Sequence, residues 1–382
     1  MQNLQSALDQ TQRQISSGRR LLTPSDDPVA AGRALDLRES LSRLTQFDRN
    51  AGIAGNRLGL EESSLTSAND ALQRVRELAL QANNATQSDE TRGLIAVELR
   101  EQLDNLVQIA NQKDAAGSYL FAGNMEGTKP VARMGANFTY NGDQGRRLIQ
   151  IGEGRQIADS DPGSSIFFQV RTGNGVFAVA PEAANTGTGV VGAISVTDPT
   201  QYDQDQYTVR FINPGNYEIL DSGGGVVGIG VFLPGDTIAF RGVELTIDGQ
   251  PDANDEFTVS PSGFQNVFAT IEGLITAVEQ DVFDDTSRAA MHNGVNASLL
   301  NLDQALGSVL DVRTQVGSRL AAIESQVDSN SALSLTLQET LSSLEDLDYA
   351  EALSRLSLGM TTLEAAQQSF VQTQQLSLFN YF

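Results

Sequence analysis

The fold is decided by residues 299–344, which read LLNLDQALGSVLDVRTQVGSRLAAIESQVDSNSALSLTLQETLSSL. Alternating spacings of three and four residues define fourteen positions here, and eleven of them are apolar, with Arg313, Asn330 and Ser334 as the exceptions. Such spacing places one apolar stripe along one helix face, as in a coiled coil. A helix of about fifty residues is about 75 Å long. Because ordinary globular helices are much shorter, the stripe predicts an equally long partner.

A partner helix is predicted in the N-terminal half of the chain. Leu58, Leu65, Leu72 and Ala79 recur every seven residues, and Glu61 is the polar exception among the seam positions. A heptad repeat of this kind is typical of a helix that packs lengthwise against another helix.

A third helix follows the second seam. Ser88 is suited to be its N-cap. Its apolar face would be formed by Ile95, Leu99, Leu103, Leu106 and Ala110. Three long helices with apolar seams predict an antiparallel bundle. The alternative is a set of independent amphipathic helices around a globular core, but such helices are usually much shorter.

The middle of the chain has a different composition. Prolines are absent from 29–129 and 262–382, whereas 21 of the 35 glycines and 12 of the 23 aromatic residues fall in 131–263. Residues 206–211 and 243–247 alternate between apolar and polar side chains, which is the period of a β-strand. Turn-forming Gly and Pro pairs separate such runs. The middle region is therefore predicted to be β-rich.

The predicted fold class is α+β. An elongated, antiparallel, coiled-coil-like bundle is formed by both chain ends, with the bundle proper in 36–130 and 264–346. A β-rich domain, 131–263, is inserted between these halves. Two terminal arms, 1–35 and 347–382, complete the chain, the first of them helical or disordered in isolation.

Charge also distinguishes the two ends. Residues 1–130 hold 14 basic and 17 acidic side chains, whereas residues 264–382 hold 4 and 15. This asymmetry favours pairing between the arms over self-pairing of the acidic one, although chance composition is the alternative. The whole chain carries a net charge of −23, which opposes binding to nucleic acid or to anionic membranes.

Enzymatic chemistry finds little support in the composition. There is no cysteine, and His292 is the single histidine, in a polar stretch that we interpret as exposed and structural. A His-based metal site or a Ser-His-Asp triad therefore has few ligands to draw on. No stretch of about 18 apolar residues exists to span a membrane, and the polar N-terminus does not resemble a secretory signal peptide.

Two further patterns are rejected as sites. The run Gly223–Gly228 fits a dinucleotide fingerprint, but the residues after it have strand and turn character, so we interpret it as a hairpin. Two sets of acidic residues lack EF-hand spacing, and we interpret them as solvated loop carboxylates. They are Asp198, Asp203 and Asp205, and Asp248, Asp252, Asp255 and Glu256. Spacing alone does not exclude a glycosidase carboxylate pair, but nothing singles one out. We predict no enzyme, no cofactor and no metal.

Both chain ends carry weak amphipathic stripes in which glutamine dilutes the apolar residues. Helices of this kind are marginal alone but can fold on binding a neighbour. The predicted assembly contacts are Leu4, Leu8, Ile15, Leu353, Leu356, Met360, Leu363 and Phe370.

Short motifs flank these stripes. The N-terminal ones are Ser17-Gly18-Arg19-Arg20 and Pro24-Ser25-Asp26-Asp27-Pro28; the others are Ser118-Tyr119-Leu120-Phe121-Ala122-Gly123, 348–352, 363–370 and 376–382. In the second motif Asp27 fits an N-cap and Pro28 the first helical position. The N-terminal pair resembles the signature of flagellin-like axial proteins. The remaining motifs resemble the hook–filament junction proteins of that family, the third hook-associated proteins of the bacterial flagellum.

The resemblance implies a structural adaptor. Copies of the chain would form a ring between the first hook-associated protein and the flagellin filament. The chain would pass unfolded through the flagellar export channel, without a cleaved signal peptide, to an extracellular position. A cytoplasmic export chaperone would bind its C-terminal arm. Members of the family carry a further stretch before the position of Met1. The alternatives are a flagellin filament subunit, an adhesin-like binding module in the middle domain, and a hydrolase there.

Overall fold

The computed structural model describes residues 2–135 and 137–378, with side chains up to residue 373. Phe379–Phe382, the end of the C-terminal motif, lie outside the described residues. The chain divides into two compact units. The first comprises Met1–Gly52, Gln150–Arg155 and Ile323–Phe382, and the second comprises Ile53–Ile149 and Gln156–Ala322.

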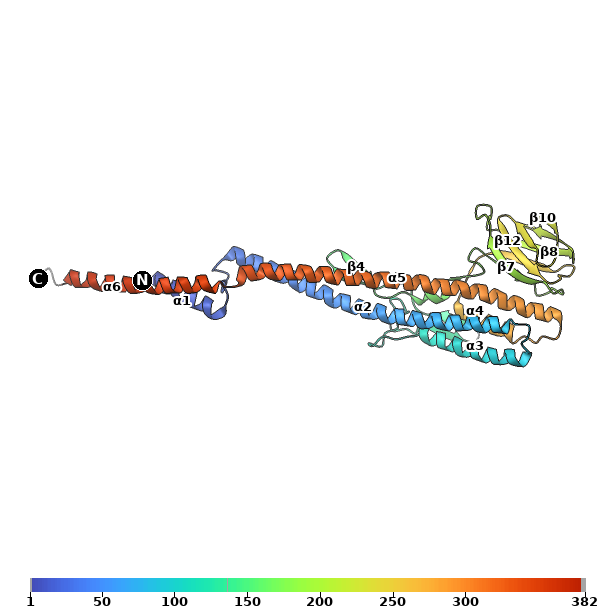
Figure 1. The fold of residues 1–382 in the computed structure, drawn as a ribbon, viewed down its shortest axis with the longest axis horizontal. Helices are drawn as coiled ribbons and strands as arrows, with labels where there is room; N and C mark the ends of the chain where they lie inside the picture. The colour runs from blue at the N-terminus through green and yellow to red at the C-terminus, as the bar shows by residue number, and fades with distance from the viewer. Residues whose placement is uncertain (1, 136, 379–382) are drawn as a thin grey trace. The chain divides into compact units, whose positions relative to one another are not determined.

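Helices dominate both chain ends (Figure 1). They are α1 (Gln2–Ser17), α2 (Pro28–Ala82), α3 (Asp89–Ala110), α4 (Val267–Val278), α5 (Asp285–Glu345) and α6 (Tyr349–Leu378). The long stripe predicted over 299–344 lies within α5. Leu302, Val309 and Val316 of this stripe are buried, as an apolar seam requires. In the second unit, α3 packs against α4, and Ser88 caps α3 as predicted by accepting a hydrogen bond from Thr91 N.

Helices α2 and α5 run antiparallel, because their contacts pair rising residue numbers on one with falling numbers on the other. The polar pairs, in order along α2, are Arg38–Glu345 and Asp48–Asn330 in the first unit, and Glu62–Arg313 and Arg76–Asp303 in the second. The predicted seam residues Leu58, Leu65, Leu72 and Ala79 are fully buried. Antiparallel pairing of the terminal helical regions is therefore confirmed.

The insert of the second unit contains two main sheets (Figure 1). One has the strand order β10-β9-β8-β13-β6 and the other β11-β12-β7. Their strands are β6 (Phe177–Pro181), β7 (Val190–Val196), β8 (Tyr207–Asn213), β9 (Asn216–Leu220), β10 (Val226–Val231), β11 (Thr237–Phe240), β12 (Val243–Asp248) and β13 (Glu256–Pro261). Both sheets contribute side chains to one apolar core, which includes Phe211, Phe257 and Leu245. The α+β class with a β-rich insert is thus confirmed.

Smaller elements connect the insert to the helices. They are β1 (Val131–Met134), β2 (Asn137–Tyr140), β3 (Leu148–Gly152), β4 (Arg155–Ala158), the π-helix η1 (Ser164–Phe168), β5 (Val170–Arg171) and β14 (Phe264–Gln265). The pairs are β1-β2, β3-β4 and β14-β5. The turn between β3 and β4 belongs to the first unit.

The glycine run Gly223–Gly228 forms the turn of the β9-β10 hairpin and the start of β10, as predicted. Asp221 Oδ1 accepts hydrogen bonds from Gly223 N at 3.0 Å and Gly225 N at 2.7 Å. No helix follows that could receive a pyrophosphate, so the dinucleotide interpretation is excluded at this run.

Asparagines of α5 join the insert to the helices of the second unit. Asn293, which is buried, accepts a hydrogen bond from Val191 N at 2.8 Å and donates one to Gly189 O at 2.9 Å. Asn301 accepts a hydrogen bond from Gly173 N at 2.7 Å. Because these bonds satisfy backbone groups of the insert, they orient the sheets on α5.

Candidate assembly interface

The two terminal arms pair with each other in the first unit, where α1 packs against α6. Gly359 marks the contact, since a Cβ there would lie 3.4 Å from Leu8 Cγ. Ala352, Leu356 and Leu363 share the face of α6 that carries Gly359, because they lie seven, three and four residues from it. Ala352 is fully buried and the two leucines are half-buried. This face of α6 is therefore covered by α1.

On α1, the predicted contacts Leu4, Leu8 and Ile15 are all half-buried. They provide the matching side of the α1-α6 pair.

The rest of the predicted stripe on α6 is uncovered. Leu353, Met360 and Phe370 are 52%, 51% and 51% exposed. The stripe expected from the sequence is thus only partly covered. Leu353 and Met360 lie beside the face that contacts α1, whereas Phe370, seven residues after Leu363, extends that face but is itself exposed.

A short backbone junction ties the entry of the N-terminal arm to the exit of α5. Arg20 N donates to Glu345 O at 2.7 Å, and Leu347 N donates to Gly18 O at 3.1 Å. The Arg20 guanidinium adds a bond from Nη2 to Leu344 O at 2.8 Å. The last carbonyls of a helix have no partner within the helix, so these bonds both satisfy the end of α5 and fix the arm to it.

The second N-terminal motif builds the start of α2. Asp27 Oδ1 accepts a hydrogen bond from Ala30 N at 3.0 Å, and the helix begins at Pro28, as predicted. Asp26 Oδ2 accepts a hydrogen bond from Thr23 N at 2.8 Å, and this backbone bond lowers the pKa of the Asp26 carboxyl. Both aspartates therefore shape the loop and the helix start.

The remaining residues of the N-terminal motifs serve the same junction. Ser17 Oγ lies 3.1 Å from Gln14 O, which it can reach as a donor. Arg19 forms an isolated β-bridge with Asp346. Pro24 lines a surface groove next to α2.

Gly18 occupies a backbone conformation that other residues rarely adopt, with φ +71°. A Cβ at this position would also lie 3.0 Å from the Tyr349 hydroxyl at the start of α6. Gly18 is therefore required both by its conformation and by the close approach of α6.

We predict that Gly18→Ala weakens the junction by about 1 kcal/mol, since Ala at positive φ is strained, and speeds hydrogen exchange around the junction roughly fivefold. The matched control is Gly32→Ala in α2, where a Cβ meets nothing within 4 Å and Ala favours the helix. Equal exchange rates in the two variants would contradict the role given to Gly18.

The motif Ser118–Gly123 lies inside the second unit. Leu120 and Phe121 are fully buried, and the Phe121 ring meets Phe167 edge-on at 5.5 Å between centroids. Gly123 has φ +67°, and a Cβ there would lie 2.1 Å from Asp143 Oδ1. These motif residues therefore build the interior rather than an exposed contact.

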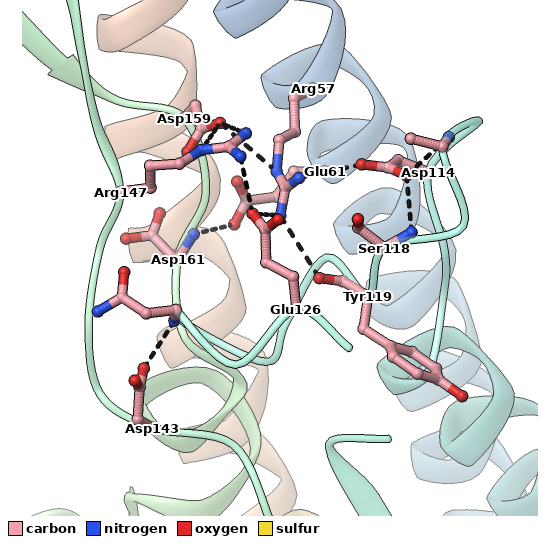
Figure 2. Close-up of polar contacts among 12 residues, drawn as sticks. Arg57, Glu61, Asp114, Ser118, Tyr119, Glu126, Asp143, Arg147, Asp159 and Asp161 are labelled. Carbon is pink, nitrogen blue, oxygen red and sulfur yellow. Dashed lines mark hydrogen bonds and ion pairs between the residues drawn. The ribbon is translucent and has the colours of Figure 1, made fainter. Parts of the chain in front are cut away.

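A charged network backs this motif (Figure 2). Arg57 of α2, only 6% exposed, lies 3.0 Å from Asp114 Oδ2 and 2.9 Å from Glu126 Oε1. Its guanidinium also reaches Tyr119 O at 3.4 Å. Arg147 extends the network to Glu126 at 3.1 Å. Arg57 thus links α2 to the loop that carries the motif.

Glu61, the polar exception of the predicted seam, is fully buried beside this network (Figure 2). Its Oε1 accepts a hydrogen bond from Asp161 N at 3.0 Å, whereas no described group hydrogen-bonds to Oε2. Burial and the nearby Asp161 charge raise the pKa of Glu61 to about 8, against the opposing effect of Arg319 and Arg57. Glu61 is therefore protonated at neutral pH.

This protonation makes stability depend on pH. The folded pKa of Glu61 lies above its ordinary value of 4.5, so between these values the folded state holds more protons than the unfolded state. Stability contributed by Glu61 is complete below about pH 4.5 and is lost as pH rises through about 8, at up to about 1.4 kcal/mol per pH unit.

We predict that Glu61→Gln removes this dependence of stability on pH and makes the variant more stable than the native chain at pH 8. The glutamine amide is neutral at every pH, whereas the Glu61 carboxyl must either bury its charge or hold a proton at that pH. Urea unfolding at several pH values measures it. Glu62→Gln, at the adjacent and partly exposed position, is the control and should retain the slope. Parallel curves for the native chain and Glu61→Gln would refute the assignment.

Two expectations about polar residues are corrected. His292 is half-buried rather than exposed, with Nδ1 2.5 Å from Asn83 Oδ1, and desolvation lowers its pKa. Asp255 is not a solvated loop carboxylate, because it is 2% exposed and accepts hydrogen bonds from Thr186 N at 2.8 Å and Gly187 N at 3.0 Å. Both reach partners distant in sequence, which local polarity cannot reveal.

Within residues 2–135 and 137–378, no three or more His, Asp or Glu side chains are grouped to hold a metal ion. The same part of the chain has no helix whose length and apolar character would let it cross a membrane.

Comparison with known proteins agrees with this arrangement. The model of the bacterial flagellin N-terminal helical region matches residues 1–126, and that of the C-terminal helical region matches residues 299–382. Flagellar hook-associated protein 3 of Escherichia coli K12 is 24% identical over 96% of this chain and 90% of its own length.

Solved structures extend the likeness. FlgL of Xanthomonas campestris is 36% identical with a TM-score of 0.76, over 80% of this chain and 99% of its own. The flagellar junction protein FlgL of Legionella pneumophila is 30% identical with a TM-score of 0.74, over 81% and 100%.

Paired terminal helical regions around a β-rich insert define the flagellin-like class of axial proteins. Within that class, the chain belongs to the family of flagellar hook-associated protein 3, the junction protein FlgL. It is a structural protein of the extracellular flagellum, at the hook–filament junction, and not an enzyme. The alternative of a filament subunit is not supported, because these matches span the arms and the insert alike.

Proposed function

We propose that the paired arms α1 and α6 are the surface through which this protein assembles. Through them it joins neighbouring copies of itself in a ring. Through them it also contacts the first hook-associated protein on the hook side and flagellin on the filament side. The observation that carries the proposal is the exposure of apolar side chains on α6, with Leu353, Met360 and Phe370 about half exposed.

The eight predicted assembly residues have two roles in this proposal. The half-buried residues hold the arms to each other. They are Leu4, Leu8, Ile15, Leu356 and Leu363. The exposed residues, Leu353, Met360 and Phe370, contact the neighbour. Burial of apolar surface stabilises by about 25 cal/mol per Å², so the outer face gains free energy only when a second subunit covers it.

Pairing of α1 with α6 alone is a weak structure. Helix α1 has 16 residues, close to the length below which isolated helices are marginal in water. The two paired arms are therefore suited to complete their folding during assembly, when a neighbouring subunit supplies a further apolar surface.

The same exposed face needs cover before export. Exposed contiguous apolar surface promotes aggregation. A cytoplasmic export chaperone that binds α6 over Leu353, Met360 and Phe370 would remove this risk and keep the arm from premature assembly. Chaperone and neighbouring subunit would then compete for one surface.

We predict that Met360→Asp prevents incorporation into the junction while the purified monomer melts like the native chain, because Met360 is 51% exposed and lies outside the α2-α5 seam. Incorporation is measured by recovery of filaments in cells of the same species that lack the native gene. The matched control is Thr361→Asp, at the adjacent exposed position, which should incorporate normally. Normal filaments with Met360→Asp would refute the proposed face.

A further inference from the structure

An exposed acidic stripe follows α5 within the first unit. Between residues 320 and 354 the chain has seven acidic residues and no Lys or Arg. The exposed residues of α5 at helical spacing are Asp328, Ser331, Leu335, Glu339 and Ser342. Leu335 is 59% exposed, so the stripe has an apolar centre with one carboxylate before it and one after it along the helix. We name these five residues the α5 stripe.

A basic stripe follows α2 in the same unit. Leu35, Arg38, Ser42, Thr45 and Arg49 recur at spacings of three and four residues, and all are exposed. We name them the α2 stripe. Leu44, Phe47 and Ala51 of the same helix are buried, so most of this stripe faces away from the α2-α5 seam. Arg38 lies at the edge of the seam, where it reaches Glu345 of α5.

The charges of the two stripes are largely unused within the chain. Asp328 and Glu339 form no ion pair with any side chain that the structure describes, and neither does Arg49. Arg38 pairs with Glu345 at 2.6 Å but remains 49% exposed. Opposite charges on outward faces therefore remain available to a neighbour.

The spacing of these charges is the same on both helices. Arg38 and Arg49 are eleven residues apart, and so are Asp328 and Glu339, which is about 16.5 Å along a helix. When α5 of a second copy lies antiparallel along α2, Arg38 meets Glu339 and Arg49 meets Asp328. Ser42 then lies opposite Leu335.

This alignment also fits the level at which the two helices meet inside one chain. Asp48 contacts Asn330 within the first unit, and the alignment between copies would place Arg49 beside Asp328. At this level neighbouring copies need almost no shift along the helix axis, whereas Arg38, which reaches Glu345 in its own chain, would meet Glu339 six residues earlier on α5 of the neighbour.

We propose that the α2 stripe of one copy binds the α5 stripe of the adjacent copy, as a lateral contact that sets the register of the assembly. Pairing of the α2 stripe with its own copy is disfavoured, because it would bring Arg38 and Arg49 against arginines, so the contact that we propose joins unlike surfaces. Each copy then uses its basic side toward one neighbour and its acidic side toward the other. Such contacts generate a ring or a helix.

This inference rests on the proposed function and adds a second contact to the one made by the arms. Exposed ion pairs are individually weak, and reversal of one charge changes affinity by roughly 1.5- to 5-fold per pair lost. Their main effect is therefore on orientation and register. The contact should weaken as ionic strength rises, because exposed charges are screened.

The absence of cysteine from the chain allows a direct test by site-specific cross-linking. The double variant Ser42→Cys/Leu335→Cys is expressed in cells of the same species that lack the native gene, and intact flagella are treated with a short bismaleimide. We expect a ladder of covalent oligomers. Each single-cysteine variant is the control and should remain monomeric.

The outcomes separate this inference from the proposed function. Filaments that form with the double variant but give no ladder would overturn the lateral contact and leave the role of the arms intact. Cross-linked dimers of Ser42→Cys alone would show a two-fold contact and also overturn it. If the native chain restores no filaments, the proposed function fails.

Charge reversal provides a second test that does not need the cysteines. Arg49→Glu should reduce incorporation roughly 1.5- to 5-fold, because it replaces an attraction to Asp328 with a repulsion. Adding Asp328→Arg in the same chain should restore incorporation, whereas the unfolding of the monomer should not change in either variant. Failure of the second substitution to rescue the first would overturn the pairing.

Discussion

The antiparallel pairing of the two chain ends is the constraint on which the rest of the molecule depends. Helices α2 and α5 bury apolar side chains in each of the two units, and backbone hydrogen bonds between Arg20 and Glu345 and between Gly18 and Leu347 tie the two chain ends together in the first unit. Because the junction holds both termini at one place, α1 and α6 emerge together and can pair. The β-rich insert is attached to α5 within the second unit through hydrogen bonds of Asn293.

The pairing also explains why the arms are suited to assembly. Helix α1 covers one face of α6 and leaves the apolar side chains of Leu353, Met360 and Phe370 exposed. The α2-α5 seam is thus packed within the monomer, whereas the arm pair still has apolar side chains to bury against a neighbour. The outward charges of α2 and α5 would orient neighbouring copies, because the basic face of one copy meets the acidic face of the next only in a head-to-tail arrangement.

Periodicity predicted the long helices, and Gly, Pro and aromatic composition predicted the β-rich insert, because both signals are local. The buried network was not predictable: Glu61 was visible only as a polar residue in a heptad seam, and its partners Asp161 and Arg319 lie 100 and more residues away. The division of the α6 stripe also escaped prediction, since period alone cannot tell which side α1 covers. His292 and Asp255 were misjudged because their hydrogen-bond partners, Asn83 and Thr186, are distant in sequence.

Hydrogen exchange of the isolated monomer tests the central claim most directly. If the inner seam is complete and the arms are not, amides of α1 and α6 should exchange about a hundredfold faster than those of α2 and α5 near Leu58, Leu65 and Val316. Protection of the arms should appear in assembled junctions. Protection of α1 and α6 in the monomer as strong as that of the inner seam would contradict the account.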